Sequence, residues 1–307
     1  MPETAPEVTA IVVSWNQRAL LADALESLSE SQSVALRLIV VDNGSTDGSA
    51  ALVAERFPGA GLITLPANVG FAAANNRGFA AGRAAGAKFV FLLNNDATVA
   101  ADCLAELKAL MDANPRCTAA CPYIMYHDQR DIIWYGGGVA ATAVGYIAHR
   151  RIRTRYAPED LNAERTRYLS GCAALIRTEA LAAAGGFDER FGMYSEDVDL
   201  GLRLIEAGGE VWVTPKARAY HRVSASALGA LSPLKSYYRA RSNALLFRRW
   251  TKLWQWPALA VGSALTFVYV AARLMLRGRF KAVAAAANGA AAGLFGLRPP
   301  AKYRLFQ

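Results

Sequence analysis

The first hundred residues alternate short apolar runs with longer segments in which apolar residues recur at helical spacing. The apolar runs are rich in Val, Ile, Leu and Phe, which predicts buried strands at 8–14, 36–41, 62–65 and 88–93. The segments between them predict helices at 19–28, 50–57 and 72–82. Apolar strands that alternate with helices are typical of a mostly parallel sheet with helices on both faces. The pattern therefore predicts an α/β, Rossmann-like fold.

Polar side chains follow two of these predicted strands directly. Asp42 ends the second run, and Asn94, Asn95 and Asp96 follow the fourth. Ligands of parallel sheets bind at the carboxyl ends of the strands, so these positions predict a nucleotide site. For Asp42 the alternative is a turn residue ahead of Gly44, since Asp often begins turns.

Five carboxylates fall within twelve residues at 188–199, where the apolar pattern breaks between elements. Such a group can supply a general base, which needs a carboxylate within reach of the substrate and partly shielded from water. The alternative is a solvated acidic loop. Asp199 and Arg203 are four residues apart on a predicted helix at 198–207, so we expect them to form a structural ion pair.

Four ordered motifs extend this picture. The runs VDNGSTDGS at 41–49, NVGFAAANNRGF at 68–79, LLNNDA at 92–97 and GGFDERFGMYSEDVDLGLRL at 185–204 resemble those of family-two glycosyltransferases. The resemblance spans roughly residues 8–225 and implies an inverting, GT-A-fold enzyme with a nucleotide-sugar donor.

The NNRG and LNND variants of these motifs are most similar to the rhamnosyltransferase branch. That similarity implies transfer of rhamnose from dTDP-rhamnose to a hydroxyl of a glycan or lipid-linked glycan in cell-surface polysaccharide synthesis. UDP-hexose and UDP-galactofuranose are the alternative donors. A nucleotidyltransferase is disfavoured, because no Gly-rich phosphate loop follows the first strand, where Ser14-Trp15-Asn16-Gln17 stands.

The resemblance also implies roles for individual residues of the donor site. Asp42 would accept a hydrogen bond from the pyrimidine ring, and further residues would shape the loops around the donor. For Asn76 a structural amide is the alternative, and for Arg77 a solvated side chain. The further residues implied in donor binding are Asn68, Gly70, Asn76, Arg77, Asn94 and Asn95.

The metal and the base are implied in the same way. Asp96 and His221 would hold a divalent cation, Mg²⁺ or Mn²⁺, on the donor diphosphate, although amides stand at 94 and 95 where further carboxylates could. For His221 the alternative is a structural role. Asp197 would be the catalytic base that deprotonates the acceptor, and Glu196 would orient that base or hold the acceptor.

Charge and hydropathy set the C-terminal part apart. Residues 211–307 carry 16 Lys and Arg and no Asp or Glu, whereas residues 1–210 carry 18 basic and 25 acidic residues. Residues 257–276 carry one charge, and as a helix they would reach about 30 Å. A second apolar run follows at 282–297. We predict a catalytic domain at 1–232 and a helical, membrane-associating segment at 233–307.

Basic flanks on both sides of these runs favour a segment that lies in the cytoplasmic leaflet, as a peripheral or monotopic protein. The alternative is a pair of Ala-rich helices packed on the catalytic domain. A nucleic-acid-binding protein is the rival class, but long uncharged runs suit lipid better than a phosphate backbone, so we expect no nucleic-acid partner.

Three further features give expectations. The polar, acidic N-terminus is unlike a signal peptide, and the four cysteines lack zinc-ligand spacing, so we expect reduced thiols and a cytoplasmic catalytic face. Residues 122–168 look like a long insertion near the acceptor cleft. Its basic cluster at 149–155 could bind an acceptor diphosphate or anionic lipid, or be a solvated loop.

Overall fold

A mixed sheet with parallel strands in its first half organises the computed structural model, which describes residues 6–223 and 232–303. Its parallel half has the order β3-β2-β1-β4. These strands are β1 (Val8–Ser14), β2 (Leu36–Asp42), β3 (Gly61–Thr64) and β4 (Phe89–Asn94). The helices between them are α1 (Arg18–Ser29), α2 (Ser49–Arg56) and α3 (Phe71–Ala84). The strand–helix alternation predicted from the sequence is confirmed, with element ends shifted by a few residues.

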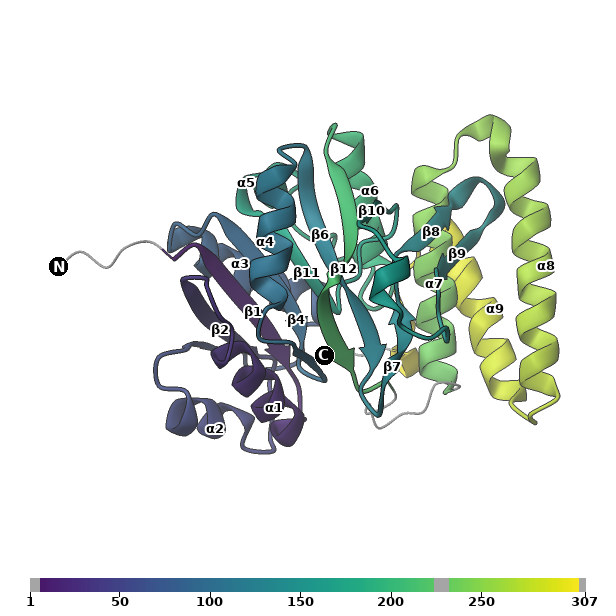
Figure 1. The fold of residues 1–307 in the computed structure, drawn as a ribbon. Coiled ribbons are helices and arrows are strands. Elements are labelled where there is room, and N and C mark those ends of the chain that lie inside the picture. The colour runs from purple at the N-terminus through teal and green to yellow at the C-terminus, as the bar shows by residue number, and fades with distance from the viewer. Residues whose placement is uncertain (1–5, 224–231, 304–307) are drawn as a thin grey trace.

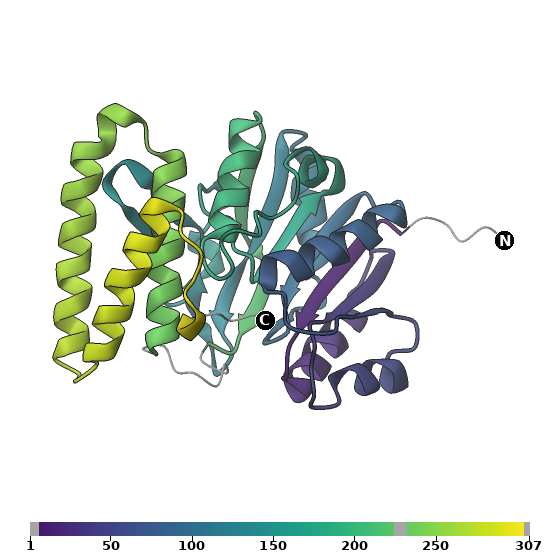
Figure 2. The ribbon, with the colours of Figure 1, turned by 180° about the vertical axis from the view of Figure 1, so that it is seen from behind.

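The sheet continues past β4 through strands from the second half of the chain. β11 (Ala173–Arg177) is antiparallel to β4 and to β6 (Cys117–Tyr126), and β12 (Glu210–His221) is parallel to β6. Shorter strands pair at this end: β5 (Ala97–Val99), β7 (Gln129–Tyr135) and β10 (Glu164–Arg165). Helices α1 and α4 (Cys103–Ala113) cover one face, and α3 and α6 (Glu196–Glu206) cover the other (Figures 1 and 2). The predicted α/β architecture with helices on both faces is confirmed.

The segment at 122–168 is only partly an insertion. It begins inside β6, whose Tyr123 is fully buried, because residues 117–126 form a continuous apolar strand between β11 and β12. After β7 the chain forms a separate hairpin of β8 (Gly138–Ala141) and β9 (Tyr146–His149), closed by a 3-10 turn at Thr142–Val144. Other short helices are α5 (Thr178–Ala183) and the 3-10 turns Pro158–Asp160, Leu253–Gln255 and Ala301–Tyr303.

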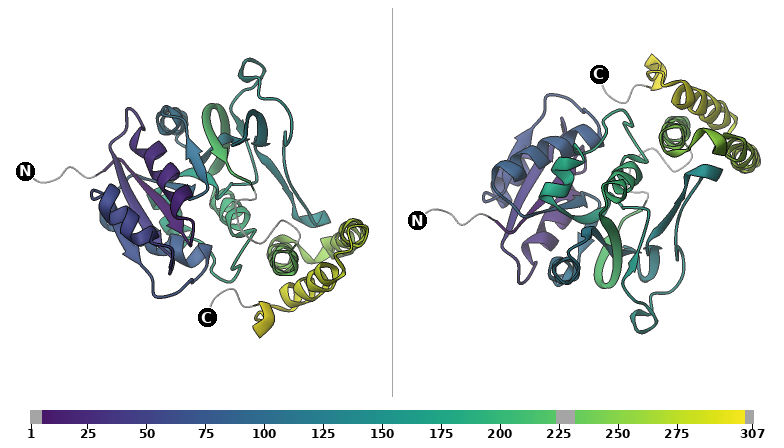
Figure 3. Two further views of the ribbon diagram at one scale, coloured as in Figure 1. Left: turned by 90° about the horizontal axis from the view of Figure 1, so that it is seen from below. Right: turned by 90° about the horizontal axis from the view of Figure 1, so that it is seen from above.

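Three helices from the C-terminal part lie together beside this hairpin (Figures 1 and 3). They are α7 (Pro233–Trp250), α8 (Trp256–Met275) and α9 (Phe280–Phe295). A Cβ atom added at Gly289 of α9 would lie 2.1 Å from the carbonyl oxygen of Tyr237 on α7. Glycine therefore lets the two helix backbones touch, a contact that any side chain would prevent.

Helix α8 is the outermost element and is poorly covered. Leu265 and Val268 are 67% and 64% exposed, and Trp254 just before the helix is 75% exposed. Within the described residues, the stretch Leu253–Met275 is long and apolar enough to cross a membrane, judged by length and composition alone. An exposed apolar surface of this kind marks an interaction site.

Candidate active site

A cavity of about 720 Å³ opens at the carboxyl ends of β1, β2 and β4, the edge at which the sequence predicts a nucleotide site. It brings together residues from motifs that are far apart in the chain. The predicted site residues that line it are Asn68, Asn94, Asn95, Asp96, Glu196, Asp197 and His221.

Asp96 and His221 form a pair on one wall. Asp96 follows β4, His221 ends β12, and the carboxylate Oδ1 lies 3.2 Å from the imidazole Nε2. Burial lowers the pKa of His221, whereas the neighbouring Cys172 and the Asp96 carboxylate raise it. An imidazole nitrogen must give up its proton before it can bind a metal, so a cation and a proton would compete at this pair. The other ring nitrogen of His221, Nδ1, is buried without a hydrogen-bond partner.

These two residues fit a hard divalent cation. Adjacent ligands of an octahedral ion at about 2.1 Å are about 3 Å apart, close to the separation seen here. Within the described residues no group of three or more His, Cys, Asp or Glu could hold a metal. A cation at this pair would therefore need most of its ligands from a bound diphosphate and water, which Mg²⁺ accepts readily.

Glu196 and Asp197 begin α6 on another wall of the cavity. Asp197 accepts hydrogen bonds from the backbone amides of Gly171, at 2.9 Å, and Val198, at 2.8 Å. Glu196 is 7% exposed, and its Oε2 atom has no partner. The two backbone amides therefore hold the Asp197 carboxylate in one orientation at the cavity wall.

Burial changes the protonation of both carboxyl groups. It raises the pKa of Asp197 to about 6, although the amides of Gly171 and Val198 lower it. Burial, together with the charge of Asp197, raises the pKa of Glu196 to about 8. Of the two carboxyl groups, Asp197 is the one whose charged form is stabilised by backbone amides from other residues, so it is the better candidate to accept a proton.

The two asparagine loops of the site hold each other in place. Asn43 donates to the side-chain oxygen of Asn68 at 3.0 Å and accepts from the amide of Val69 at 2.9 Å. Asn68 also accepts from the amide of Gly70, which immediately precedes α3. Asn43 lines the cavity, and only its place beside Asp42 in the first motif could have indicated this.

Asp42 and Gly70 lie beside the cavity but are not among its lining residues. Asp42 is 4% exposed, and its carboxylate accepts long hydrogen bonds, at 3.3 and 3.4 Å, from the amide of Ser45. This is the contact expected of a turn residue. Recognition of a pyrimidine ring by Asp42 stays a prediction.

Asn76 and Arg77 lie away from the cavity. Asn76 donates to the carbonyl of Phe187 and to Glu189 and accepts from the amide of Phe187, which uses its whole amide group. A Cβ atom at Gly186 would lie 2.6 Å from the Asn76 oxygen, so glycine is required there. Asn76 thus anchors the loop before the carboxylates, as in the structural alternative, and Arg77 is exposed on α3.

An aromatic wall went unnoticed in the sequence. Trp134 packs edge-to-face against both His149 and His221, with ring centroids 4.6 and 4.5 Å apart, and Tyr168 packs against His149 at 4.9 Å. Burial lowers the pKa of His149 to about 4, so its ring is neutral. All four side chains line the cavity, where flat apolar rings can contact a sugar.

The basic cluster at 149–155 contributes less positive charge to the cavity than its sequence suggests. His149 and Ile152 line the cavity, whereas Arg150 and Arg151 pair with Glu164 at 3.5 and 3.3 Å. Most of its positive charge therefore serves contacts within the protein.

Helix α7 was also missed as part of the site. Its Arg239 and Asn243 line the cavity next to Tyr194 and Ser195, whose φ angles of +68° and +64° are unusual for residues with side chains. Ser195 donates to Asn243 at 2.8 Å, and the guanidinium of Arg239 lies 5.1 Å from the Tyr194 ring centroid. α7 therefore holds the strained backbone directly before Glu196.

Residues 9–185 match the family described as glycosyl transferase family 2. The chain belongs to this family. It is 33% identical over 231 residues, 69% of its length and 74% of the relative's, to N-acetylglucosaminyl-diphospho-decaprenol L-rhamnosyltransferase of Mycobacterium tuberculosis strain H37Rv. The resemblance to the rhamnosyltransferase branch is thereby confirmed.

Solved structures share the fold of this family 2 glycosyltransferase. A mannosyltransferase from Pyrobaculum calidifontis in complex with GDP-Man and Mn²⁺ has a TM-score of 0.58 at 20% identity, covering 96% of this chain and 89% of its own. GalNAc-T7 with UDP, GalNAc and Mn²⁺ has a TM-score of 0.58 at 13% identity, covering 80% of this chain and 51% of its own. The predicted GT-A architecture is confirmed, and the protein is a glycosyltransferase of glycan biosynthesis.

Proposed function

We propose that this enzyme transfers rhamnose from dTDP-rhamnose, with inversion, to a hydroxyl of a lipid-linked glycan whose sugar is attached through a diphosphate. The observation that carries the proposal is that one cavity contains both the half-buried Asp197 carboxylate, which backbone amides hold, and a carboxylate–imidazole pair suited to a cation. The mycobacterial relative, which spans 69% of the chain, supports the choice of sugar and acceptor class.

The proposed mechanism is a single displacement. Asp197 accepts the proton of the acceptor hydroxyl. At the same time the oxygen of that hydroxyl attacks the anomeric carbon from the face opposite the diphosphate. The new carbon–oxygen bond forms as the bond to the donor phosphate breaks, and the nucleoside diphosphate leaves with the bonding electrons. Asp96 and His221 would hold a divalent cation, Mg²⁺ or Mn²⁺, which would neutralise charge on the leaving diphosphate.

The other residues have supporting roles in this proposal. Asn68, Asn94 and Asn95 contact the donor, and Glu196 holds the acceptor. Burial and the charge of Asp197 raise the pKa of Glu196, which favours a neutral carboxyl group that can donate a hydrogen bond to the acceptor. The aromatic wall of Trp134, His149 and Tyr168 offers apolar surface to a sugar ring.

We further propose that the enzyme works at the cytoplasmic face of the membrane, as a peripheral or monotopic protein, with residues 1–232 catalytic and 233–307 on the lipid. The exposed apolar side chains of α8 and the 16 basic residues after 210 support this placement. Because Arg239 and Asn243 also line the cavity, the membrane segment takes part in the site.

Purified enzyme should transfer labelled rhamnose from dTDP-rhamnose to N-acetylglucosaminyl-diphospho-polyprenol in the presence of Mn²⁺. The measurement is the sugar incorporated into extractable lipid, with UDP-glucose, UDP-galactose and UDP-galactofuranose as competing donors. If only a UDP-sugar supports transfer and dTDP-rhamnose does not, the proposed donor is wrong. The absence of transfer from every donor would overturn the proposed reaction.

Replacing Asp197 with Asn should lower kcat by about 10²–10⁴-fold and leave donor affinity unchanged, because the amide keeps the shape but not the basicity. In the wild type, kcat/KM should fall as the pH drops below about 6, where Asp197 takes up a proton. Asp112→Asn on α4, a partly exposed carboxylate outside the cavity, is the control. Wild-type turnover in Asp197→Asn would rule out this base.

Asp96→Ala should weaken dTDP-rhamnose binding in Mn²⁺, because the cation loses its anionic protein ligand. Calorimetry should show that chelation weakens wild-type binding and abolishes the difference between wild type and variant. If binding and activity survive complete chelation, side-chain cations must neutralise the diphosphate instead.

The full-length protein should float with anionic liposomes at low salt. Rising salt should reduce but not abolish binding, since salt screens the basic residues and not the buried apolar ones. Leu265→Glu on α8 should reduce flotation at every salt concentration, whereas Ala51→Glu on exposed α2 should not. Equal flotation of both variants would argue that α8 does not face lipid.

A further inference from the structure

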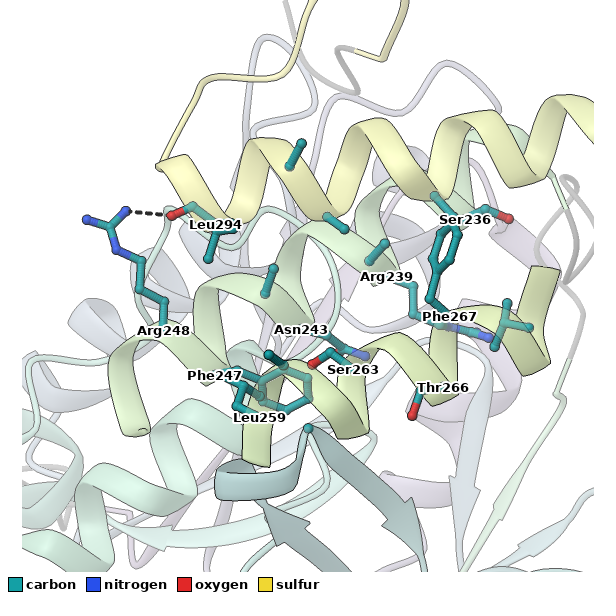
Figure 4. A pocket seen from close by; sticks show the side chains of 18 of the residues that line it. Ser236, Arg239, Asn243, Phe247, Arg248, Leu259, Ser263, Thr266, Phe267 and Leu294 are labelled. Carbon is teal, nitrogen blue, oxygen red and sulfur yellow. Dashed lines mark hydrogen bonds between the residues drawn. The ribbon is translucent and has the colours of Figure 1, made fainter. Parts of the chain in front are cut away.

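A second cavity, of about 440 Å³, lies between α7, α8 and α9 (Figure 4). Its volume falls in the range of small-molecule sites, about 300–1,000 Å³. Apolar side chains from all three helices form most of its lining. They include Phe247, Leu259, Phe267, Val270, Leu274 and Leu294.

This apolar cavity adjoins the active site. Arg239 and Asn243, one turn apart on α7, line both cavities. Asn243 also accepts the hydrogen bond from Ser195, the residue before Glu196. A molecule could therefore place one end among the apolar side chains and the other beside the candidate catalytic carboxylates.

Positive charge marks the boundary between the two cavities. Arg239 faces both, and Lys235, one turn earlier on α7, lines the apolar one. Because Lys235 and Arg239 are four residues apart on α7, the two cations lie on the same face of the helix. Two neighbouring cations beside an apolar cavity complement an anionic group attached to an aliphatic chain.

We infer that the apolar cavity binds the isoprenoid chain of a diphospholipid acceptor, with its diphosphate beside Arg239 and Lys235 and its sugar in the catalytic cavity. This inference rests on the proposed function and adds to it the binding site for the lipid. The volume holds the part of the chain nearest the phosphates. The remainder leaves along the exposed side of α8, where Val261 and Leu265 form an apolar surface.

Equilibrium binding of radiolabelled geranylgeranyl diphosphate to the full-length protein tests the cavity without sugar transfer. Ala290→Trp fills the cavity from α9 and should weaken binding by about tenfold or more, because the buried isoprene surface is lost. Ala287→Trp is the matched control, since Ala287 lies on the same helix but is exposed and outside the lining. It should bind like the wild type.

Thr266→Trp narrows the same cavity from one exposed position on α8, which keeps the test valid if Ala290→Trp fails to fold. Arg239→Gln should weaken binding of the diphosphate roughly tenfold and leave binding of geranylgeraniol unchanged, because only the charged contact is removed. Inorganic diphosphate should compete about a hundredfold less well than the prenyl diphosphate.

Wild-type affinity in both Ala290→Trp and Thr266→Trp would overturn the inference. Competition by inorganic diphosphate as strong as that by the prenyl diphosphate would do so too. The proposed function can fail separately, if the wild type transfers no sugar to a lipid-linked acceptor while cavity-dependent prenyl binding persists. Conversely, transfer with no effect of either cavity variant would leave the function standing and remove only the lipid site.

Discussion

The arrangement of the active site depends on the contacts that the buried carboxylate of Asp199 makes. It is fully buried and accepts hydrogen bonds from Arg203 at 2.8 Å on its own helix and from the indole of Trp250 at 2.9 Å. Arg249 lies 3.3 Å away and also bonds to Asp188 at 3.1 Å. Removing one partner from a buried ion pair typically costs about 3–5 kcal/mol, since the remaining charge is left without compensation.

This contact joins the loop at 188, the start of α6 and the end of α7. Earlier on α7, Arg241 and Ser242 donate to the backbone carbonyl of Phe191, so α7 also holds the loop at 188–195, directly before the two carboxylates. Glu196 and Asp197 are therefore placed by a helix that lies outside the region of family similarity, which ends at 185. A helix assigned from its sequence to the membrane turns out to determine the geometry of the catalytic cavity.

Much of the fold and part of the site could be predicted from the sequence, because these features depend on residues that are close together in the chain. Apolar runs predicted the first four strands, and the spacing of Asp199 and Arg203 predicted the ion pair that the structure shows. Asn76 was harder, because an amide on a helix gives no local sign of whether it contacts ligand or loop. Its partner Phe187 is 111 residues away in sequence.

The aromatic wall and the contribution of α7 to the cavity could not be predicted either, because their residues also meet partners that are far away in the sequence. Trp134, His149 and His221 come from separate strands, and only the pairing of those strands brings the rings together. Arg239 was one of 16 basic residues in a segment whose average properties suggest lipid contact. An average over the whole segment does not reveal that an individual basic residue such as Arg239 faces the catalytic cavity.

The contact between Asp199 and Trp250 also sets an order of assembly during synthesis. The sheet strands precede α7 in the chain, so most of the nucleotide-binding half can fold on the ribosome while α7 is still being made. Until Trp250 emerges, Asp199 has only Arg203 as a partner, and the backbone before Glu196 lacks its contact with Asn243 on α7. A nascent chain thus completes its catalytic cavity only once α7, the helix that precedes the apolar helices α8 and α9, has left the ribosome.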